Sequence, residues 1–188
     1  MVRSGARACT TQRKTIQNLI AALGVSILAV LVLVWIVPRD DREILPDVDF
    51  QQVADHAQPG YEQTLTNPDV PSSWQANQAE IRTGQDGVVE WYVGFLVLGD
   101  DRAQEFVGMS QGLGANDTWT YEKVDRSSPT GSIMIDGVEW DEYDYRDLDP
   151  DDAGNTLYSL VHVDDDATHV LYGSHSAESV QELAARIF

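Results

Sequence analysis

The feature that most constrains the fold of this chain is a continuous run of 19 uncharged residues, LIAALGVSILAVLVLVWIV, from Leu19 to Val37. At about 1.5 Å of rise per residue, a helix of that length spans roughly 28 Å, which is close to the hydrocarbon thickness of a bilayer. Trp35 suits the aromatic belt at a membrane surface, and Pro38 with the charged residues after it would end the segment. We therefore expect a transmembrane signal anchor at residues 16–37.

The two sides of this segment differ sharply in charge. No acidic residue precedes Asp40, so all 31 Asp and Glu follow the segment. Four basic residues precede it: Arg3, Arg7, Arg13 and Lys14. This asymmetry predicts a short cytoplasmic tail at residues 1–15 and a C-terminal domain outside the membrane. A cleaved signal peptide is the alternative, but the apolar run exceeds the usual length of about 7–15 residues and no small-x-small site follows Val37.

The rest of the chain divides into a linker at 38–48 and one extracytoplasmic domain at 49–188. Apolar periodicity predicts helices at 49–57, 116–124 and 176–188, with Asp47 or Asp49 and Ser176 as N-caps. Apolar runs between turn residues predict strands at 74–82, 88–99, 103–109, 132–135, 138–146, 155–163 and 168–174. Short turns make neighbouring strands antiparallel. The predicted fold class is therefore α+β, with a mainly antiparallel sheet of about seven strands packed by two or three helices.

Two further patterns bear on the sheet. The run VVEWYVGFLVLG at 88–99 is almost continuously apolar, which predicts a strand buried on both faces in the middle of the sheet. The segment from Trp74 to Gly108 also has the same order of strands and turns as the segment from Trp140 to Gly173, and each is followed by a predicted helix. A common meander geometry explains this echo as well as a duplication does.

The acidic stretch YRDLDPDDAGNT contains the alternating carboxylates of a calcium loop. Asp147, Asp149 and Asp151 occupy ligand positions 1, 3 and 5, with Asp152 next. The glycine required at position 6 and the glutamate required at position 12 are missing, as are flanking helices. The stretch fits the tip of a hairpin better than a calcium site, although weak binding of cations stays open.

Two other patterns are candidates for chemistry. Ser110 lies in GMSQG, which matches G-x-S-x-G, but that motif needs a turn from a parallel strand into a helix, and this Ser follows an antiparallel strand. His162 and His169 are expected to face each other across the last hairpin, where they would form an incomplete zinc site or a pair that titrates near neutral pH. No phosphate-binding glycine loop, Cys/His metal spacing or basic patch is present in the sequence.

Several short motifs follow one another in a characteristic order: P-x-x-W from Pro71, W-x-V-G-F from Trp91, G-V-E-W from Gly137, Y-S-L-V from Tyr158 and Y-G-S from Tyr172. Together with an apolar helix ending in VPR and a closing S-x-E…E-L-A helix, they resemble the single-pass membrane family "domain of unknown function 4245" of high-GC Gram-positive bacteria. The resemblance covers most of the chain. It implies a location in the cell membrane and a shared fold, and it brings no catalytic residues with it.

These features favour a non-enzymatic binding or accessory role at the cell envelope, without a cofactor. The acidic domain would repel nucleic acid and attract cations or a basic envelope partner, while the N-terminal helix would hold the protein at the membrane. Two alternatives stay open. One is a small envelope hydrolase that uses Ser110 or the His162/His169 pair, and the other is a domain that binds a lipid-like ligand.

Overall fold

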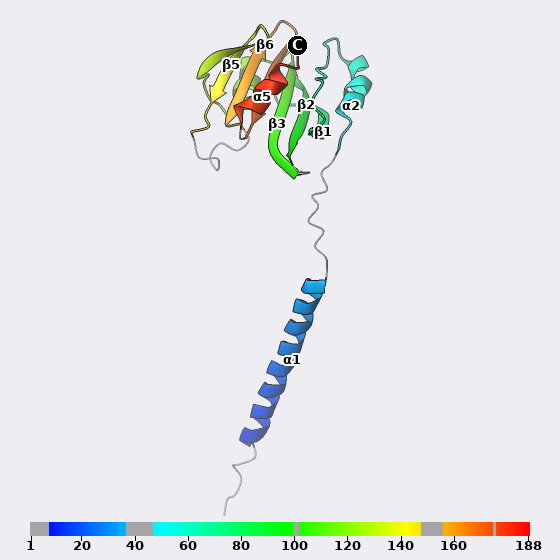
Figure 1. Cartoon of the computed structure of the whole chain (residues 1–188), viewed down its shortest axis with the longest axis vertical. Helices are drawn as coiled ribbons and strands as arrows, with labels where there is room; N and C mark the ends of the chain where they lie inside the picture. Colours follow the sequence, from blue (N-terminus) through cyan, green and yellow to red (C-terminus); the bar gives the residue numbers. More distant parts are fainter. Residues whose placement is uncertain (1–7, 37–46, 100–101, 148–155, 175) are drawn as a thin grey trace, which may run out of the picture. The chain divides into compact units, whose positions relative to one another are not determined.

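The computed structural model describes residues 8–36, 47–99, 102–147, 156–174 and 176–188. The chain divides into two compact units, Met1–Glu43 and Ile44–Phe188, and helix α1 (Ala8–Ile36) belongs to the first (Figure 1). Among the described residues, no helix is both long and apolar enough to cross a bilayer. Val37, where the predicted anchor ends, lies outside the described residues, as does most of the predicted linker.

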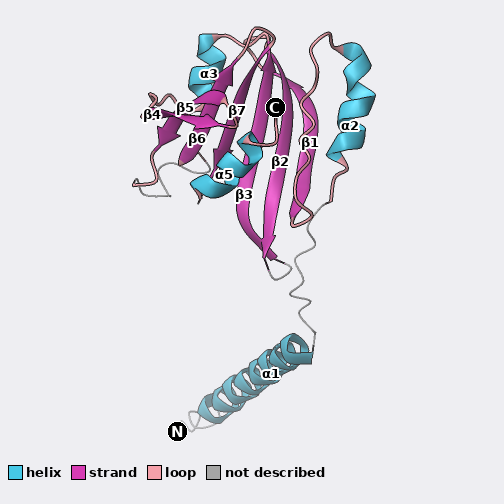
Figure 2. Cartoon of the chain, turned by 45° about the horizontal axis from the view of Figure 1, so that its top comes forward, coloured by secondary structure: helices cyan, strands magenta, loops and turns pink. Residues whose placement is uncertain are grey.

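The second unit is built on one antiparallel sheet of seven strands, in the order β1-β2-β3-β7-β6-β5-β4 (Figure 2). Its strands are β1 (Trp74–Thr83), β2 (Val89–Gly99), β3 (Arg102–Leu113), β4 (Gly131–Ile135), β5 (Val138–Asp144), β6 (Tyr158–Val163) and β7 (Ala167–Gly173). Two meanders, β1-β2-β3 and β4-β5-β6-β7, join where β3 pairs with β7. The α+β class and the seven strands are thereby confirmed.

Helices cover both faces of the sheet. Helices α2 (Phe50–Ala57) and α5 (Ala177–Ala184) lie on one face, and α3 (Asp117–Lys123) lies on the other. Apolar side chains of α2 and α5 share the main core with Trp91 and Leu171, whereas Trp119 of α3 packs in a second cluster with Val161 and Val170. We call these the α5 face and the α3 face.

The local signals in the sequence act as expected. The Asp49 carboxylate accepts a hydrogen bond from the backbone N–H of Gln52 at 3.0 Å and caps α2. Ser176 caps α5 in the same way. Asp136 and Gly137 both adopt positive φ, 48° and 88°, which is what a tight two-residue turn between β4 and β5 requires. A 3-10 turn, η1 (Gln58–Gly60), follows α2 and was not predicted.

Two expectations about the sheet need correction. Strand β2 lies second from the edge rather than in the middle, and both of its faces are buried from Glu90 to Phe95 because α3 covers part of the face opposite the main core. The echo between the two meanders is confirmed as an order of elements, including the helix that follows each, but the two helices do not occupy equivalent places. Helices α3 and α5 lie on opposite faces, whereas a twofold axis normal to the sheet would place them on the same face.

Candidate functional site

One row of side chains crosses the α5 face of the sheet from strand to strand. Trp91 pairs with Gln111, Gln111 pairs with His169, and His169 pairs with His162. The predicted cross-strand histidine pair is confirmed. Gln111 and His169 are both buried, so this row introduces polar groups into a face that otherwise holds the main core. Such groups are costly unless they find hydrogen-bond partners.

The partners come from the loop at residues 63–67, which lies over the row. The backbone carbonyl of Thr66 accepts a hydrogen bond from Trp91 Nε1 at 2.8 Å. The Gln111 amide accepts from Thr66 N and donates to the Thr64 carbonyl, both at 2.8 Å. His169 Nε2 lies 2.7 Å from Thr66 Oγ1. Three strands therefore hold this loop in place through their side chains.

His169 forms the floor of the site and is only 3% exposed. Burial lowers the pKa of His169 to about 4; Asp164 opposes this shift, and His162 adds slightly to it. The imidazole is therefore neutral at neutral pH. Its Nε2 is engaged by Thr66, but its Nδ1 is buried without a hydrogen-bond partner among the described residues. Whichever tautomer is present, one polar atom of the ring is left unsatisfied.

Phe188 packs against the two histidines. Its ring meets His169 edge-on at a centroid distance of 5.3 Å and His162 at 5.2 Å, and it also approaches Trp140 at 6.0 Å. Phe188 is nevertheless 59% exposed. The ring thus provides an apolar wall that is open to solvent.

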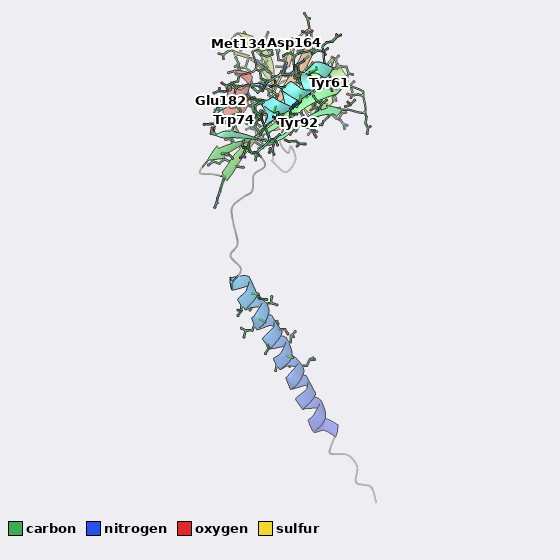
Figure 3. The ribbon with its side chains drawn as sticks, turned by 90° about the vertical axis from the view of Figure 1, so that its right-hand side faces the viewer. Tyr61, Trp74, Tyr92, Met134, Asp164 and Glu182 are labelled. Carbon is green, nitrogen blue, oxygen red and sulfur yellow. The ribbon has the colours of Figure 1, made fainter. Side chains whose placement is uncertain are left out.

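Between the loop and Phe188 lies a cavity of about 400 Å³. Its lining residues are Gln63, Thr64, Leu65, Thr66, Asn67, Gln111, Asp164, Asp166, Ala167, His169, Ile187 and Phe188. Most are polar, two are acidic, and none is Lys or Arg. Asp164, on the turn between β6 and β7, is labelled in Figure 3. A volume of this size lies within the range of about 300–1,000 Å³ that is usual for small-molecule sites, but the lining is more polar than that of most such sites.

Thr66 and His169 have the spacing of a nucleophile and its general base. Two features make the pair a poor catalyst. The Nδ1 of His169 has no carboxylate partner among the described residues to orient the ring, and the low pKa of His169 makes it a weak base. The geometry therefore favours holding the loop and a ligand over activating the hydroxyl.

Ser110 lies on the α3 face, fully buried in the middle of β3. Its hydroxyl donates to Glu90 Oε1 at 2.7 Å, and Lys123 Nζ of α3 lies 2.6 Å from the same oxygen. Strand β3 is antiparallel to both neighbours and continues past Ser110 to Leu113, so the residue does not sit on the strand-to-helix turn of a nucleophile elbow. The three groups join α3 to the sheet.

The acidic stretch connects β5 to β6, which pair in antiparallel fashion up to Asp144 and Tyr158. It is therefore a hairpin connection, as predicted. Asp147 is exposed in a turn, while Asp149, Asp151 and Asp152 lie outside the described residues, so the calcium interpretation stays a prediction. Across the part of the chain that the structure describes, no three His, Cys, Asp or Glu residues are grouped so as to hold a metal ion.

Sequence reasoning missed most of the partners in both clusters. The loop at 63–67 carries no recognisable motif, and its contacts to Gln111 and His169 span 45 and 103 residues of sequence. Glu90 did have a signal, because it is the one charge within the apolar run at 88–99. A lone charge in a strand buried on both faces requires a partner, here Lys123.

The fold and the site define a class: a small α+β domain with a ligand-sized cavity beside an antiparallel sheet, carried on a chain with a separate N-terminal helix. The model of the family described as "Protein of unknown function (DUF4245)" matches residues 12–187, and the chain belongs to this family. No curated protein and no solved structure matches the chain.

Proposed function

We propose that this protein is a membrane-anchored, extracytoplasmic binding protein that holds a small polar ligand in the cavity under the 63–67 loop. The observation that carries this proposal is the unused hydrogen-bonding capacity around the cavity. The side chains of Gln63, Thr64 and Asn67 line it and make no hydrogen bond to another described residue, and the Nδ1 of His169 is unsatisfied at its floor. A ligand would complete these groups.

The lining also indicates the kind of ligand. Asp164 and Asp166 carry the only formal charges among the lining side chains, since His169 is neutral. An anion would be repelled, so we infer a neutral or positively charged molecule. Ile187 and Phe188 offer an apolar wall for its carbon skeleton. The predominance of polar side chains favours such a ligand over a lipid-like one.

The N-terminal unit supports the anchor. Within that unit, the apolar side chains of α1 between Leu19 and Leu33 are exposed. The uncharged run continues to Val37, and basic residues precede it. A bilayer would bury this surface, with the N-terminus in the cytoplasm and the C-terminal unit outside.

Localisation is tested in cells that express the chain with a C-terminal tag. We expect the protein to stay in the membrane pellet after carbonate extraction, and the tag to be digested when protease is added to cells whose wall has been removed. Release by carbonate, or protection of the tag, would refute the anchor or its orientation.

Ligand binding is tested on the full-length protein in non-ionic detergent, incubated with the small-molecule fraction of a cell-envelope extract. Native mass spectrometry should show an added mass on the wild type. Thr64→Tyr, which fills the cavity from an exposed position, should lose it, and Thr83→Tyr, an equivalent change at an exposed site on β1, should keep it. Equal retention by both variants would place any binding elsewhere.

A further inference from the structure

A second surface, on the α3 face, is apolar and open. In the folded unit, the large apolar side chains exposed by half or more are Tyr121 at 50%, Met134 at 62%, Val163 at 63% and Phe188, within the described residues. Phe188 belongs to the cavity on the α5 face. The other three come from α3, β4 and β6, and the strand register brings them to one region of the α3 face (Met134 is labelled in Figure 3).

The register defines this region. Met134 pairs with Glu139 across β4 and β5. Asp141 pairs with Val161 across β5 and β6, and the same register two residues further along places Glu139 beside Val163. Alternation along β6 puts Val163 on the same face as Val161, which packs under α3. Apolar and acidic side chains therefore alternate across the open part of the sheet.

A groove of about 360 Å³ runs between this region and α3. Its lining residues are Asp117, Thr120, Tyr121, Val124, Ser127, Ser128, Pro129, Asp141, Tyr143, Val161 and Val163. Valine and tyrosine side chains form its floor and one rim. The neighbouring strand β4 is an edge of the sheet, so its outer side is also free of a strand partner within the described chain.

The charges around the groove have one sign. Asp117 and Asp141 line it, and no Lys or Arg of the described chain does. Lys123, the last residue of α3, and Arg126, in the turn that follows, are already paired, Lys123 with Glu90 and Arg126 with Glu122. A partner with positive charges would therefore meet unpaired carboxylates next to apolar surface.

We propose that this groove is a docking site for a basic, apolar segment of another protein, in which aliphatic side chains fill the groove and Lys or Arg side chains contact Asp117, Glu139 and Asp141. A second copy of this chain is a poor occupant, because it would bring the same carboxylates against one another. The site is on the opposite face of the sheet from the ligand cavity, so it goes beyond the proposed function and can fail independently of it.

The test uses the full-length protein in non-ionic detergent and a fluorescent peptide that alternates leucine and lysine. Fluorescence anisotropy should detect binding of this peptide, and much weaker binding of its counterparts with serine for leucine or glutamate for lysine. Methyl NMR signals of Met134 and Val163 should shift on binding. Asp141→Lys should weaken the complex by about tenfold and Val163→Ser by about fivefold, which are ordinary losses for one charge pair and one apolar contact.

Asp55→Lys, the same change of charge at an exposed position of α2, is the matched control and should weaken binding by less than about twofold, as expected for long-range attraction alone. Equal losses for Asp55→Lys and Asp141→Lys would overturn the proposal, because binding would then follow net charge only. Unshifted Met134 and Val163 methyl signals would also overturn it. So would self-association of the chain that Val163→Ser abolishes, since a second copy would then occupy the groove.

Discussion

Acidification should destabilise the folded unit through His169. The pKa of this side chain is about 4 in the folded state because burial disfavours the charged ring, and 6.5 is its ordinary value. The folded state therefore resists protonation more than the unfolded state does. The contribution of the neutral His169 side chain to the free energy of unfolding is complete above pH 6.5 and falls as the pH drops from 6.5 towards 4. Below pH 4 it does not fall further.

The size of the effect follows from these two values. With a pKa of about 4 in the folded state and 6.5 in the unfolded state, the free energy of unfolding at pH 5 is about 2 kcal/mol lower than at pH 7.5 from this group alone, and the limiting loss at lower pH is about 3 kcal/mol. The loss reflects the cost of placing a charge at a site that is 3% exposed, where the hydroxyl of Thr66 is the one hydrogen-bond partner of the ring among the described residues.

The assay is urea unfolding of the full-length protein at pH 7.5 and pH 5, followed by tryptophan fluorescence, for the wild type and for His169→Gln. The amide of glutamine does not titrate, so the carboxylates contribute equally to both proteins and cancel in the difference. We expect the wild type to lose about 2 kcal/mol more than the variant between the two pH values. His56→Gln, at an exposed position of α2, should behave like the wild type. An equal loss in the wild type and His169→Gln would refute the assignment of a buried, neutral imidazole.

Three further changes test the packing around the two clusters. Gln111→Leu keeps the volume but removes both hydrogen bonds to the covering loop; it should cost about 2 kcal/mol of unfolding free energy and speed hydrogen exchange of the Thr66 amide. Lys123→Met leaves the Glu90 carboxylate buried without its counter-charge, so it should lower the free energy of unfolding by about 3 kcal/mol in the same urea assay. The double variant with Glu90→Gln should recover most of that loss, because the buried charge is then removed. Gly108→Ala would place a methyl group 2.4–2.6 Å from the ring carbons of Tyr172, so it should destabilise by about 1–3 kcal/mol and shift the ring resonances of Tyr172 in NMR spectra.

The sequence predicts the parts of this fold that local chemistry determines. The Asp136-Gly137 turn, the Ser176 cap and the pairing of His162 with His169 each depend on a few neighbouring residues, and each lies where expected. The boundaries of the strands are also close, except that β3 runs on to Leu113, past the predicted end at residue 109. Gly112 lies in this extension, and Trp119 lies against its backbone, where a β-carbon would come within 2.9 Å of the ring.

The parts that were missed depend on tertiary placement. Helices α3 and α5 cover opposite faces of the sheet, although the two meanders that precede them have the same order of strands. The face that a helix covers depends on the side to which the last strand residue points and on the connection that follows it. The contact of Gln111 with the covering loop joins residues 45 apart in sequence, and no periodicity records it. The cavity under the 63–67 loop is therefore invisible in the sequence, whereas the pairing of His169, on its floor, with His162 across the hairpin is predictable.

The two polar clusters differ in whether all of their buried polar atoms have hydrogen-bond partners. On the α3 face, Glu90 receives both the Ser110 hydroxyl and the Lys123 ammonium, so its charge is compensated and the cluster is complete without a ligand. On the α5 face, the loop satisfies Gln111 at both ends of its amide, but one nitrogen of His169 has no hydrogen-bond partner in the described part of the chain. A buried polar atom without a partner costs about 1–3 kcal/mol, and phenylalanine or leucine at this position would avoid that cost. Among the described residues, this buried nitrogen is therefore the atom at the floor of the cavity that a ligand would satisfy, and it supports the proposed binding function.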